Sequence, residues 1–285
     1  MRRLLGIAAA VALMAPVAVA RAEDLHGTIQ IKGSDTMVNL CQAWAEAFMK
    51  QHPNVTIAVT GGGSGTGFAA LVERSCDLAA VSRTIKQQEI DQAKAKGFTP
   101  QEWRVALDGL AVVVHPSNPV KQLTIAQLRD LFTGKITNWS EIGGPNKKVT
   151  LLSREVNSGT HVYFKEHVLG KGADGKSLEY SPDALLLPSS QAIADEVASN
   201  PDAIGYYGMG YLNANNTAVS VAKDAAGPFV SPSEATVRSG EYPISRPLLF
   251  YSPGEPTGAV KMFLDFTLSP DGQRMVHDND FVPLR

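Results

Sequence analysis

The 285-residue sequence has only two cysteines, Cys41 and Cys76, and no long apolar run after its first 20 residues. Two cysteines cannot build a zinc cluster or a framework of several disulfides, although one bridge and two free buried thiols both remain open. The six histidines have no metal-ligand spacing such as His-x-x-x-His. We therefore expect neither a metal site nor a cofactor.

Runs of basic residues are missing as well. The chain has 26 Lys+Arg and 28 Asp+Glu, and residues 1–22 hold three arginines and no acid, so residues 23–285 carry a net charge of −5. A net-acidic chain without a basic patch argues against nucleic acid as a partner. Any anion that the chain binds must be held by local donors rather than attracted by the overall charge.

Residues 1–22 are typical of a secretory signal peptide. Two arginines precede an apolar stretch over residues 4–20, and residues 20–22 (Ala-Arg-Ala) form a small-x-small cleavage site without a cysteine for a lipid anchor. We expect the mature chain to begin near Glu23, to be soluble and to lie in a bacterial periplasm. The remaining 263 of the 285 residues suffice for two modest lobes, each with its own core.

Predicted strands and helices alternate along the rest of the chain. Strands are expected at residues 28–31, 55–59, 77–82, 110–114, 149–152, 203–207 and 247–251, and helices at 40–48, 68–73, 125–132 and 260–268. This order predicts an α/β fold with mostly parallel sheets flanked by helices, in which ligands bind beyond the carboxyl ends of strands. We assign residues 23–110 and 248–285 to one lobe and residues 111–247 to the other.

Hydroxyl groups gather at three places where a predicted strand gives way to a helix. These places are Gly33-Ser34-Asp35-Thr36, the glycine-rich residues 61–67 with Ser64, and Arg154 followed by Ser158-Gly159-Thr160. Each alone is an ordinary helix cap or turn. An arginine, however, presents a planar fork of donors that fits an oxyanion, and the start of the following helix would turn free N–H groups toward the same anion.

The glycine-rich segment can line up backbone N–H groups as an anion nest. It fits neither the G-x-G-x-x-G pattern nor a P-loop, because Phe68 stands where a P-loop has lysine. In an α/β fold all three clusters can converge on one cleft. Ser82 and Arg83, at the end of the third strand, would add a hydroxyl and a second guanidinium, although Arg83 can equally pair with a surface carboxylate.

Together these motifs resemble the phosphate-binding proteins of the high-affinity ABC phosphate importer. The resemblance covers the whole chain after the leader and includes residues 77–83, 203–206 and 269–273. It implies a two-lobed periplasmic binding-protein fold (type II) that holds its ligand in the interlobe cleft. It also implies a monomeric binding protein, not an enzyme, that captures inorganic phosphate and delivers it to the permease subunits of an ABC transporter.

The resemblance further implies which residues hold the phosphate: Ser34, Asp35, Thr36, Ser64, Ser82, Arg83, Arg154, Ser158, Gly159 and Thr160. Some members of the family have an aspartate after the third strand, which accepts the proton that phosphate retains near neutral pH and so disfavours sulfate. This chain has Arg83 there. Asp35 and Asp108 are the candidate acceptors instead, and Glu155 is expected to brace Arg154.

Three alternatives stay open. The same fold could bind sulfate, molybdate or tungstate. A secreted phosphatase would need Ser64 or Ser158 as nucleophile, but neither lies in a G-x-S-x-G elbow, and His161 faces away from its neighbour Thr160 if both are helical. An adhesin or signalling module would need an exposed aromatic patch, and the three tryptophans are scattered along the chain.

Overall fold

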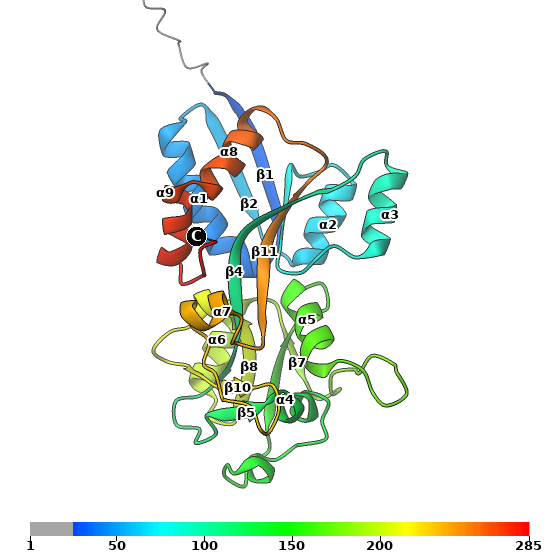
Figure 1. Ribbon diagram of the computed structural model, residues 1–285, viewed down its shortest axis with the longest axis vertical. Helices are drawn as coiled ribbons and strands as arrows, with labels where there is room; N and C mark the ends of the chain where they lie inside the picture. The colour runs from blue at the N-terminus through cyan, green and yellow to red at the C-terminus, as the bar shows by residue number, and fades with distance from the viewer. Residues whose placement is uncertain (1–24, 285) are drawn as a thin grey trace, which may run out of the picture.

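The computed structural model describes residues 25–284, so the predicted signal peptide lies outside the described residues. Figure 1 shows two lobes joined by two long strands, β4 (Gln101–Val114) and β11 (Ser245–Ser252), which pair antiparallel. They form the centre of one sheet, whose order is β2 (Val55–Thr60), β1 (Gly27–Gly33), β3 (Leu78–Val81), β11, β4, β8 (Ala203–Gly208), β6 (Thr150–Arg154) and β7 (Leu185–Leu187). A short strand, β9 (Thr217–Ala218), also pairs with β4.

The lobe that contains the first residues is built on β1, which pairs parallel with both β2 and β3. Its helices are α1 (Val38–Gln51), α2 (Ser64–Val72), α3 (Gln87–Ala95), α8 (Gly258–Leu268) and α9 (Pro270–Asp278). A short 3₁₀ helix, η1 (Asp35–Met37), directly precedes α1. Leu40, Trp44 and Phe48 recur on one face of α1 and are fully buried, as their spacing predicts. The indole N–H of Trp44 donates to the carbonyl of Gly272, which fixes α9 against α1.

The other lobe is built on β8 and β6, which are parallel to each other. Its helices are α4 (Ile125–Phe132), α5 (Gly159–Phe164), α6 (Ser190–Ser199) and α7 (Glu234–Ser239), with a two-stranded sheet of β5 (Gln122–Thr124) and β10 (Ser220–Ala222) and the short helices η2 (Trp139–Ile142), η3 (Lys165–Leu169) and η4 (Met209–Tyr211). Phe132, Phe164 and Tyr206 form an aromatic core, in which the rings of Phe164 and Tyr206 stack with centroids 4.0 Å apart.

Most of the predicted elements are present, and the departures have physical causes. The helix predicted from residue 68 begins at Ser64, inside the glycine-rich segment. Helix α3 was not predicted, and it has no apolar stripe, because Ala93 is its one buried residue. Strand β4 begins at Gln101 rather than at residue 110. The predicted lobe boundaries at residues 110 and 247 fall inside β4 and β11, and the division at these residues stays a prediction.

Cys41 and Cys76 are both free thiols in the structure. Each is buried, and burial raises the pKa of the Cys76 thiol to about 12 and that of Cys41 further. The alternative with two buried thiols is therefore the one that the structure shows. Within residues 25–284 no helix is both long and apolar enough to span a membrane.

Candidate functional site

Three hydroxyl groups meet at the carboxyl ends of β1 and β3 in the first lobe. Ser34 follows β1, Ser82 follows β3, and Ser64 opens α2. The Ser34 hydroxyl donates to Ser82 Oγ over 3.0 Å, and the Ser82 backbone N–H donates to Ser64 Oγ over 3.0 Å. All three side chains are buried. The prediction that strand-end hydroxyls converge is confirmed for these residues.

Gly33 explains how β1 can turn so close to β3. Its φ is +137°, and a Cβ at this position would lie 2.2 Å from the carbonyl oxygen of Ala80. The next residue, Ser34, donates its backbone N–H to that carbonyl over 2.7 Å. A side chain at residue 33 would therefore push Ser34 away from the cluster.

The second lobe contributes residues at the end of β6 and the start of α5. Ser158 is the N-cap of α5, and its Oγ accepts the backbone N–H groups of Thr160 (3.2 Å) and His161 (3.4 Å). Two of the N–H groups that were expected to face an anion are therefore already paired with Ser158. Because Ser158 Oγ accepts both of these bonds, its own proton remains to be donated.

The two lobes touch each other at this cluster. Thr36 Oγ1 lies 2.9 Å from Thr160 Oγ1, and Arg154 Nη2 lies 3.0 Å from Asp35 Oδ2. The backbone of Gly159 packs so closely on the first lobe that a Cβ there would lie 2.2 Å from Ser64 Oγ. Serine and threonine side chains from both lobes thus meet in one buried polar cluster.

Arg154 is buried, with 1% of its surface exposed. Its Nη1 donates to Ser190 Oγ over 2.8 Å and its Nη2 to the carbonyl of Pro188 over 3.0 Å, whereas its buried Nε has no hydrogen-bond partner. Burial lowers the pKa of Arg154, and the nearby Asp35 carboxylate raises it again. A buried, unpaired donor of this kind is a group that an anion can satisfy.

The residue that braces Arg154 is Asp35 of the other lobe. The expectation that Glu155 has this role is wrong, because Glu155 is exposed and the ion pair of Arg154 is with Asp35. Asp35 Oδ2 also accepts the backbone N–H of Ser190 over 2.8 Å. A carboxylate from one lobe thus orients a guanidinium from the other, which sequence spacing alone could not reveal.

Arg83 does not join the cluster. Its Nη2 and Nη1 donate to Glu89 Oε1 and Oε2 over 2.6 and 2.8 Å. The guanidinium carbon lies 4.7 Å from the centre of the Phe68 ring. Of the two roles considered for Arg83, the structure shows the one in which it pairs with a carboxylate. This pair is buried between α2 and α3 rather than on the surface, because the side chains of Arg83 and Glu89 are only 5% and 15% exposed.

Arg246 is the site residue that sequence reasoning missed. It lies on β11 directly opposite Asp108 of β4, and its Nε donates to Asp108 Oδ2 over 2.9 Å. Its Nη1 donates to the carbonyl of Ser82 over 3.1 Å and its Nη2 to Thr160 Oγ1 over 3.0 Å. Arg246 stands in no motif, so the one available signal was a cation within a strand that is otherwise largely apolar.

The hydrogen bonds of the two candidate nucleophiles do not support acid–base catalysis. Ser64 contacts Ser82, and Ser158 accepts backbone N–H groups. His161 Nδ1 lies 3.3 Å from Ser153 Oγ instead, and burial lowers the pKa of His161. A Ser–His pair at Ser64 or Ser158, which a phosphatase would need, is not formed among these residues.

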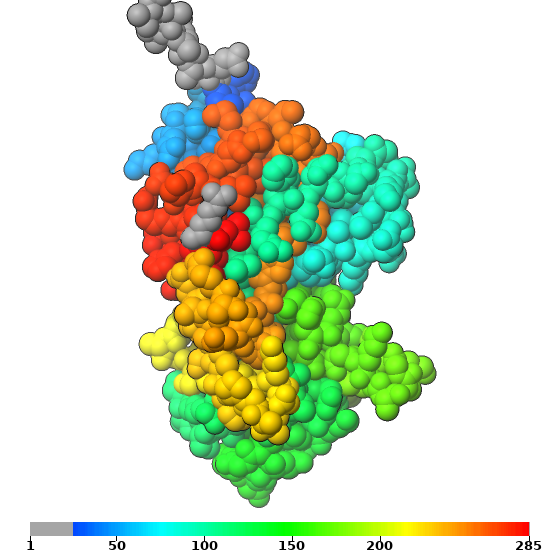
Figure 2. All heavy atoms as spheres, viewed as in Figure 1, coloured from blue at the N-terminus to red at the C-terminus, as the bar shows by residue number. Residues whose placement is uncertain are grey.

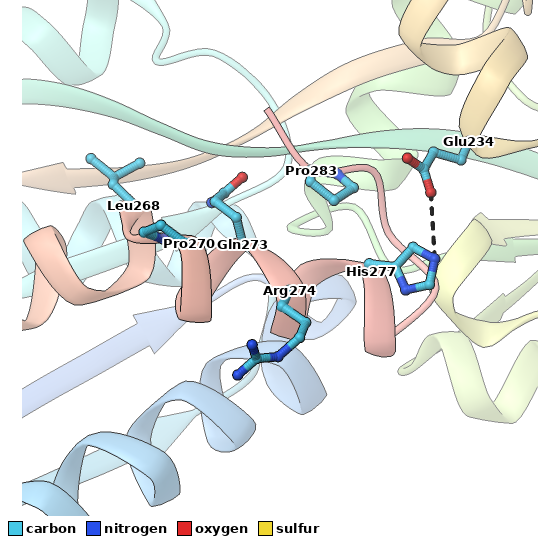
Figure 3. A pocket seen from close by; sticks show the side chains of 7 residues that line it. All are labelled: Glu234, Leu268, Pro270, Gln273, Arg274, His277 and Pro283. Atoms are coloured by element: carbon cyan, nitrogen blue, oxygen red, sulfur yellow. Dashed lines mark ion pairs between the residues drawn. The ribbon is translucent and has the colours of Figure 1, made fainter. Parts of the chain in front are cut away.

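A cavity of about 490 Å³ lies elsewhere, between the C-terminal segment and α7 (Figure 3). Its lining includes Arg274, Gln273 and the exposed ion pair between His277 and Glu234, whose atoms are 3.7 Å apart. None of the cluster hydroxyls lines it. Figure 2 shows the two lobes in contact on this face. Arg274 and His277 are exposed, whereas the cluster hydroxyls are buried, so the cavity is separate from the cluster.

Two lobes linked by paired strands, with guanidinium and hydroxyl groups from both sides between them, are the architecture of a substrate-binding protein. The family model described as a PBP superfamily domain matches residues 18–271. The chain has the two-lobed periplasmic binding-protein fold that its sequence predicts, and it is a member of this superfamily.

Curated relatives narrow the family further. The chain is 34% identical to the phosphate-binding protein PstS of Pseudomonas aeruginosa, over 98% of this chain and 90% of that protein. It is 35% identical to the phosphate-binding protein PstS of Bacillus subtilis, over 92% of this chain and 82% of that protein. The chain therefore belongs to the PstS family of phosphate-binding proteins.

Solved structures agree with this placement. A phosphate ABC transporter substrate-binding protein from Clostridium perfringens, solved with bound phosphate, is 33% identical and matches with a TM-score of 0.81 over 91% of this chain and 100% of that chain. An ABC-type phosphate transport receptor from Vibrio cholerae is 28% identical, with a TM-score of 0.72 over 90% of this chain and 100% of that chain.

Proposed function

We propose that the chain is a binding protein that captures inorganic phosphate between its lobes and delivers it to the permease subunits of an ABC importer. The observation that carries the proposal is the buried cluster between the lobes, to which Ser64 contributes from one side and Arg154 and Thr160 from the other. Relatives that are named for phosphate binding support the choice of anion.

The chemistry of the cluster suits a tetrahedral oxyanion. Ser158 has a hydroxyl proton to donate, and Arg154 has a buried Nε without a partner. Hydrogen bonds to a charged oxygen strengthen when water is excluded, because the surroundings then screen them less. The residues that we propose to surround phosphate are Ser34, Asp35, Thr36, Ser64, Ser82, Arg154, Ser158, Gly159 and Thr160; Arg83 remains with Glu89.

Asp35 is the better placed of the two candidate proton acceptors. Asp108 Oδ1 accepts the backbone N–H of Met209, and its Oδ2 is bound by Arg246. Asp35 Oδ2 accepts Ser190 and pairs with Arg154, but its Oδ1 has no hydrogen bond within residues 25–284. A free carboxylate oxygen can accept the proton of hydrogen phosphate, and it repels sulfate, which has no proton to offer.

This part of the proposal is tested by Asp35→Asn and Asp108→Asn. We expect Asp35→Asn to lower the preference for phosphate over sulfate by about tenfold, because the amide can donate to sulfate. Calorimetric titration with each anion measures the ratio directly. An unchanged ratio of phosphate affinity to sulfate affinity in both variants would show that neither carboxylate accepts the proton of phosphate.

The proposal as a whole is tested on wild-type protein that has been unfolded and refolded to strip bound ions. Titration calorimetry with phosphate, sulfate and molybdate, at one pH on either side of neutrality, should give one tight phosphate per chain and weak binding of the others. Tight binding of sulfate or molybdate with weak binding of phosphate would be consistent with an anion site between the lobes but would show that phosphate is not its ligand.

The monomeric state and the periplasmic location belong to the same proposal. The location is supported by the signal-peptide pattern of residues 1–22, and a monomer suffices because both lobes of one chain supply the cluster. Fractionation of cells that express the full chain should recover it in the periplasm at the size of a processed monomer. Recovery in the cytoplasm at full length would contradict this.

A further inference from the structure

Asp108 and Arg246 form a buried ion pair on the two strands that join the lobes. The strand register places them directly opposite each other, and both side chains are 0% exposed. Arg246 Nε and Nη2 lie 2.9 and 2.8 Å from Asp108 Oδ2. Burial raises the pKa of Asp108, and the Arg246 guanidinium opposes that shift.

The guanidinium of Arg246 has a second edge, which faces the cluster. Nη1 donates to the Ser82 carbonyl over 3.1 Å, and Nη2 donates to Thr160 Oγ1 over 3.0 Å. Ser82 belongs to one lobe and Thr160 to the other, so Nη1 and Nη2 of Arg246 lie where the two lobes meet. Nη2 thus uses both of its hydrogens, for Asp108 and Thr160, whereas one of the two hydrogens on Nη1 has no acceptor within residues 25–284 and can be donated to an oxyanion.

We propose that Arg246 is a second guanidinium that binds the anion directly, with Asp108 as its positioning residue. Nη1 then donates its remaining hydrogen to an anion oxygen beside Ser82, and Nη2 holds the Thr160 hydroxyl toward the same anion. This inference rests on the proposed function and deepens it, because it adds a cation at the junction of the lobes to Arg154 on the second lobe. Because Arg246 lies on β11, which joins the lobes, its guanidinium reaches the cluster from the point where the lobes are connected.

The competing account is that the pair only fastens β4 to β11. A structural pair would also need acceptors for the other buried N–H groups of Arg246, and buried ion pairs can often be replaced by apolar residues without loss of stability. What favours the anion-binding account is that these acceptors, Ser82 and Thr160, are both residues of the buried cluster and come from different lobes. The two accounts differ in what happens to anion affinity once the charge of Asp108 is removed together with that of Arg246.

The test compares Arg246→Lys and the double variant Asp108→Asn/Arg246→Gln with wild type, using phosphate in titration calorimetry. Lysine keeps a cation beside Asp108 but cannot donate from two coplanar nitrogens. We expect both variants to bind phosphate about 10- to 100-fold more weakly, the usual effect of losing a charge-assisted hydrogen bond to a buried anion. Thermal unfolding of the ligand-free proteins reports whether each variant is folded.

Arg104→Gln is the matched control, because it removes one arginine charge from an exposed position on β4, the strand that pairs with β11. It should bind phosphate like wild type. If wild type binds phosphate and the double variant binds it within about threefold, Arg246 is only a structural residue and the inference is wrong. If folded wild type binds no phosphate at all, the proposed function fails instead, so the two failures are distinguishable.

Discussion

Replacing Gly159 with alanine should weaken phosphate binding severely while leaving the ligand-free protein folded. A Cβ at this position would lie 2.2 Å from Ser64 Oγ and 2.7 Å from Ser82 Oγ, and nonbonded Cβ contacts need more than 3.0 Å. Both obstructing atoms belong to the opposite lobe. Either Ser64 must turn away or the lobes must stay apart.

The magnitude follows from the contacts that would be lost. Turning Ser64 away breaks the buried hydrogen bond from the Ser82 N–H, which costs about 1–3 kcal/mol, and removes a hydroxyl from the anion at a cost of about 1.5–3 kcal/mol. Together these losses come to about 2.5–6 kcal/mol, which corresponds to a dissociation constant roughly 60- to 20,000-fold higher. We expect the ligand-free protein to escape this cost by holding its lobes apart, which moves Gly159 away from Ser64.

Within its own lobe Gly159 has no need to be glycine. It is not among the glycines with positive φ, and it begins helix α5, where alanine is about 0.5–1 kcal/mol more favourable than glycine. The melting temperature of ligand-free Gly159→Ala should therefore equal or slightly exceed that of wild type. This separates a closure defect from a folding defect.

Titration calorimetry gives the affinity, and differential scanning fluorimetry without phosphate gives the stability. Gly227→Ala is the matched control, because a Cβ there meets nothing closer than 3.6 Å and its φ is not positive. Phosphate binding by Gly159→Ala within about threefold of wild type would refute the reasoning, since the lobes would then bind the anion without the observed approach.

Three further predictions concern other parts of the chain. Asn157 Nδ2 donates to the Gly62 carbonyl across the lobes over 2.6 Å, so Asn157→Ala should weaken phosphate binding about three- to tenfold in calorimetry without lowering ligand-free stability; unchanged affinity would mean that this contact does not hold the lobes together. Burial lowers the pKa of His161, so below the unfolded pKa of about 6.5 the unfolded chain binds a proton that the native state does not. The free energy of unfolding should then fall between about pH 7 and pH 5, and urea titrations should show a shallower fall in His161→Gln; identical slopes would contradict the assignment. Cys41 and Cys76 should react with a chromogenic thiol reagent only in denaturant, and rapid labelling of the native protein would show that they are not buried.

The sequence was sufficient for those parts of the fold that local pattern determines. Helix α1 has Leu40, Trp44 and Phe48 at helical spacing, and the helix predicted at residues 125–132 has the bounds of α4, because Thr124 caps it through Gln127. Helix α3 was missed for the opposite reason. It lies on the surface with one buried residue, so its sequence has no apolar residues at helical spacing that would predict a helix.

The site was predictable as far as it rests on motifs at strand ends. Ser64 and Ser158 were found because a hydroxyl beside glycines at a helix start is visible in sequence. The partners of Arg154 and the role of Arg246 were not, because Asp35 and Arg246 reach the cluster from distant parts of the chain through the contact of two lobes. Arg83 shows the reverse case, because it directly follows Ser82 of the cluster but pairs with Glu89 of α3, six positions further along the chain.

The most direct test of the central claim is a crystal structure of the stripped protein with phosphate added. The account predicts one phosphate between the lobes, with its oxygens within hydrogen-bonding distance of Ser64, Arg154 and Thr160 and of the Arg246 fork. Phosphate bound outside this cluster, or held by one lobe alone, would contradict it.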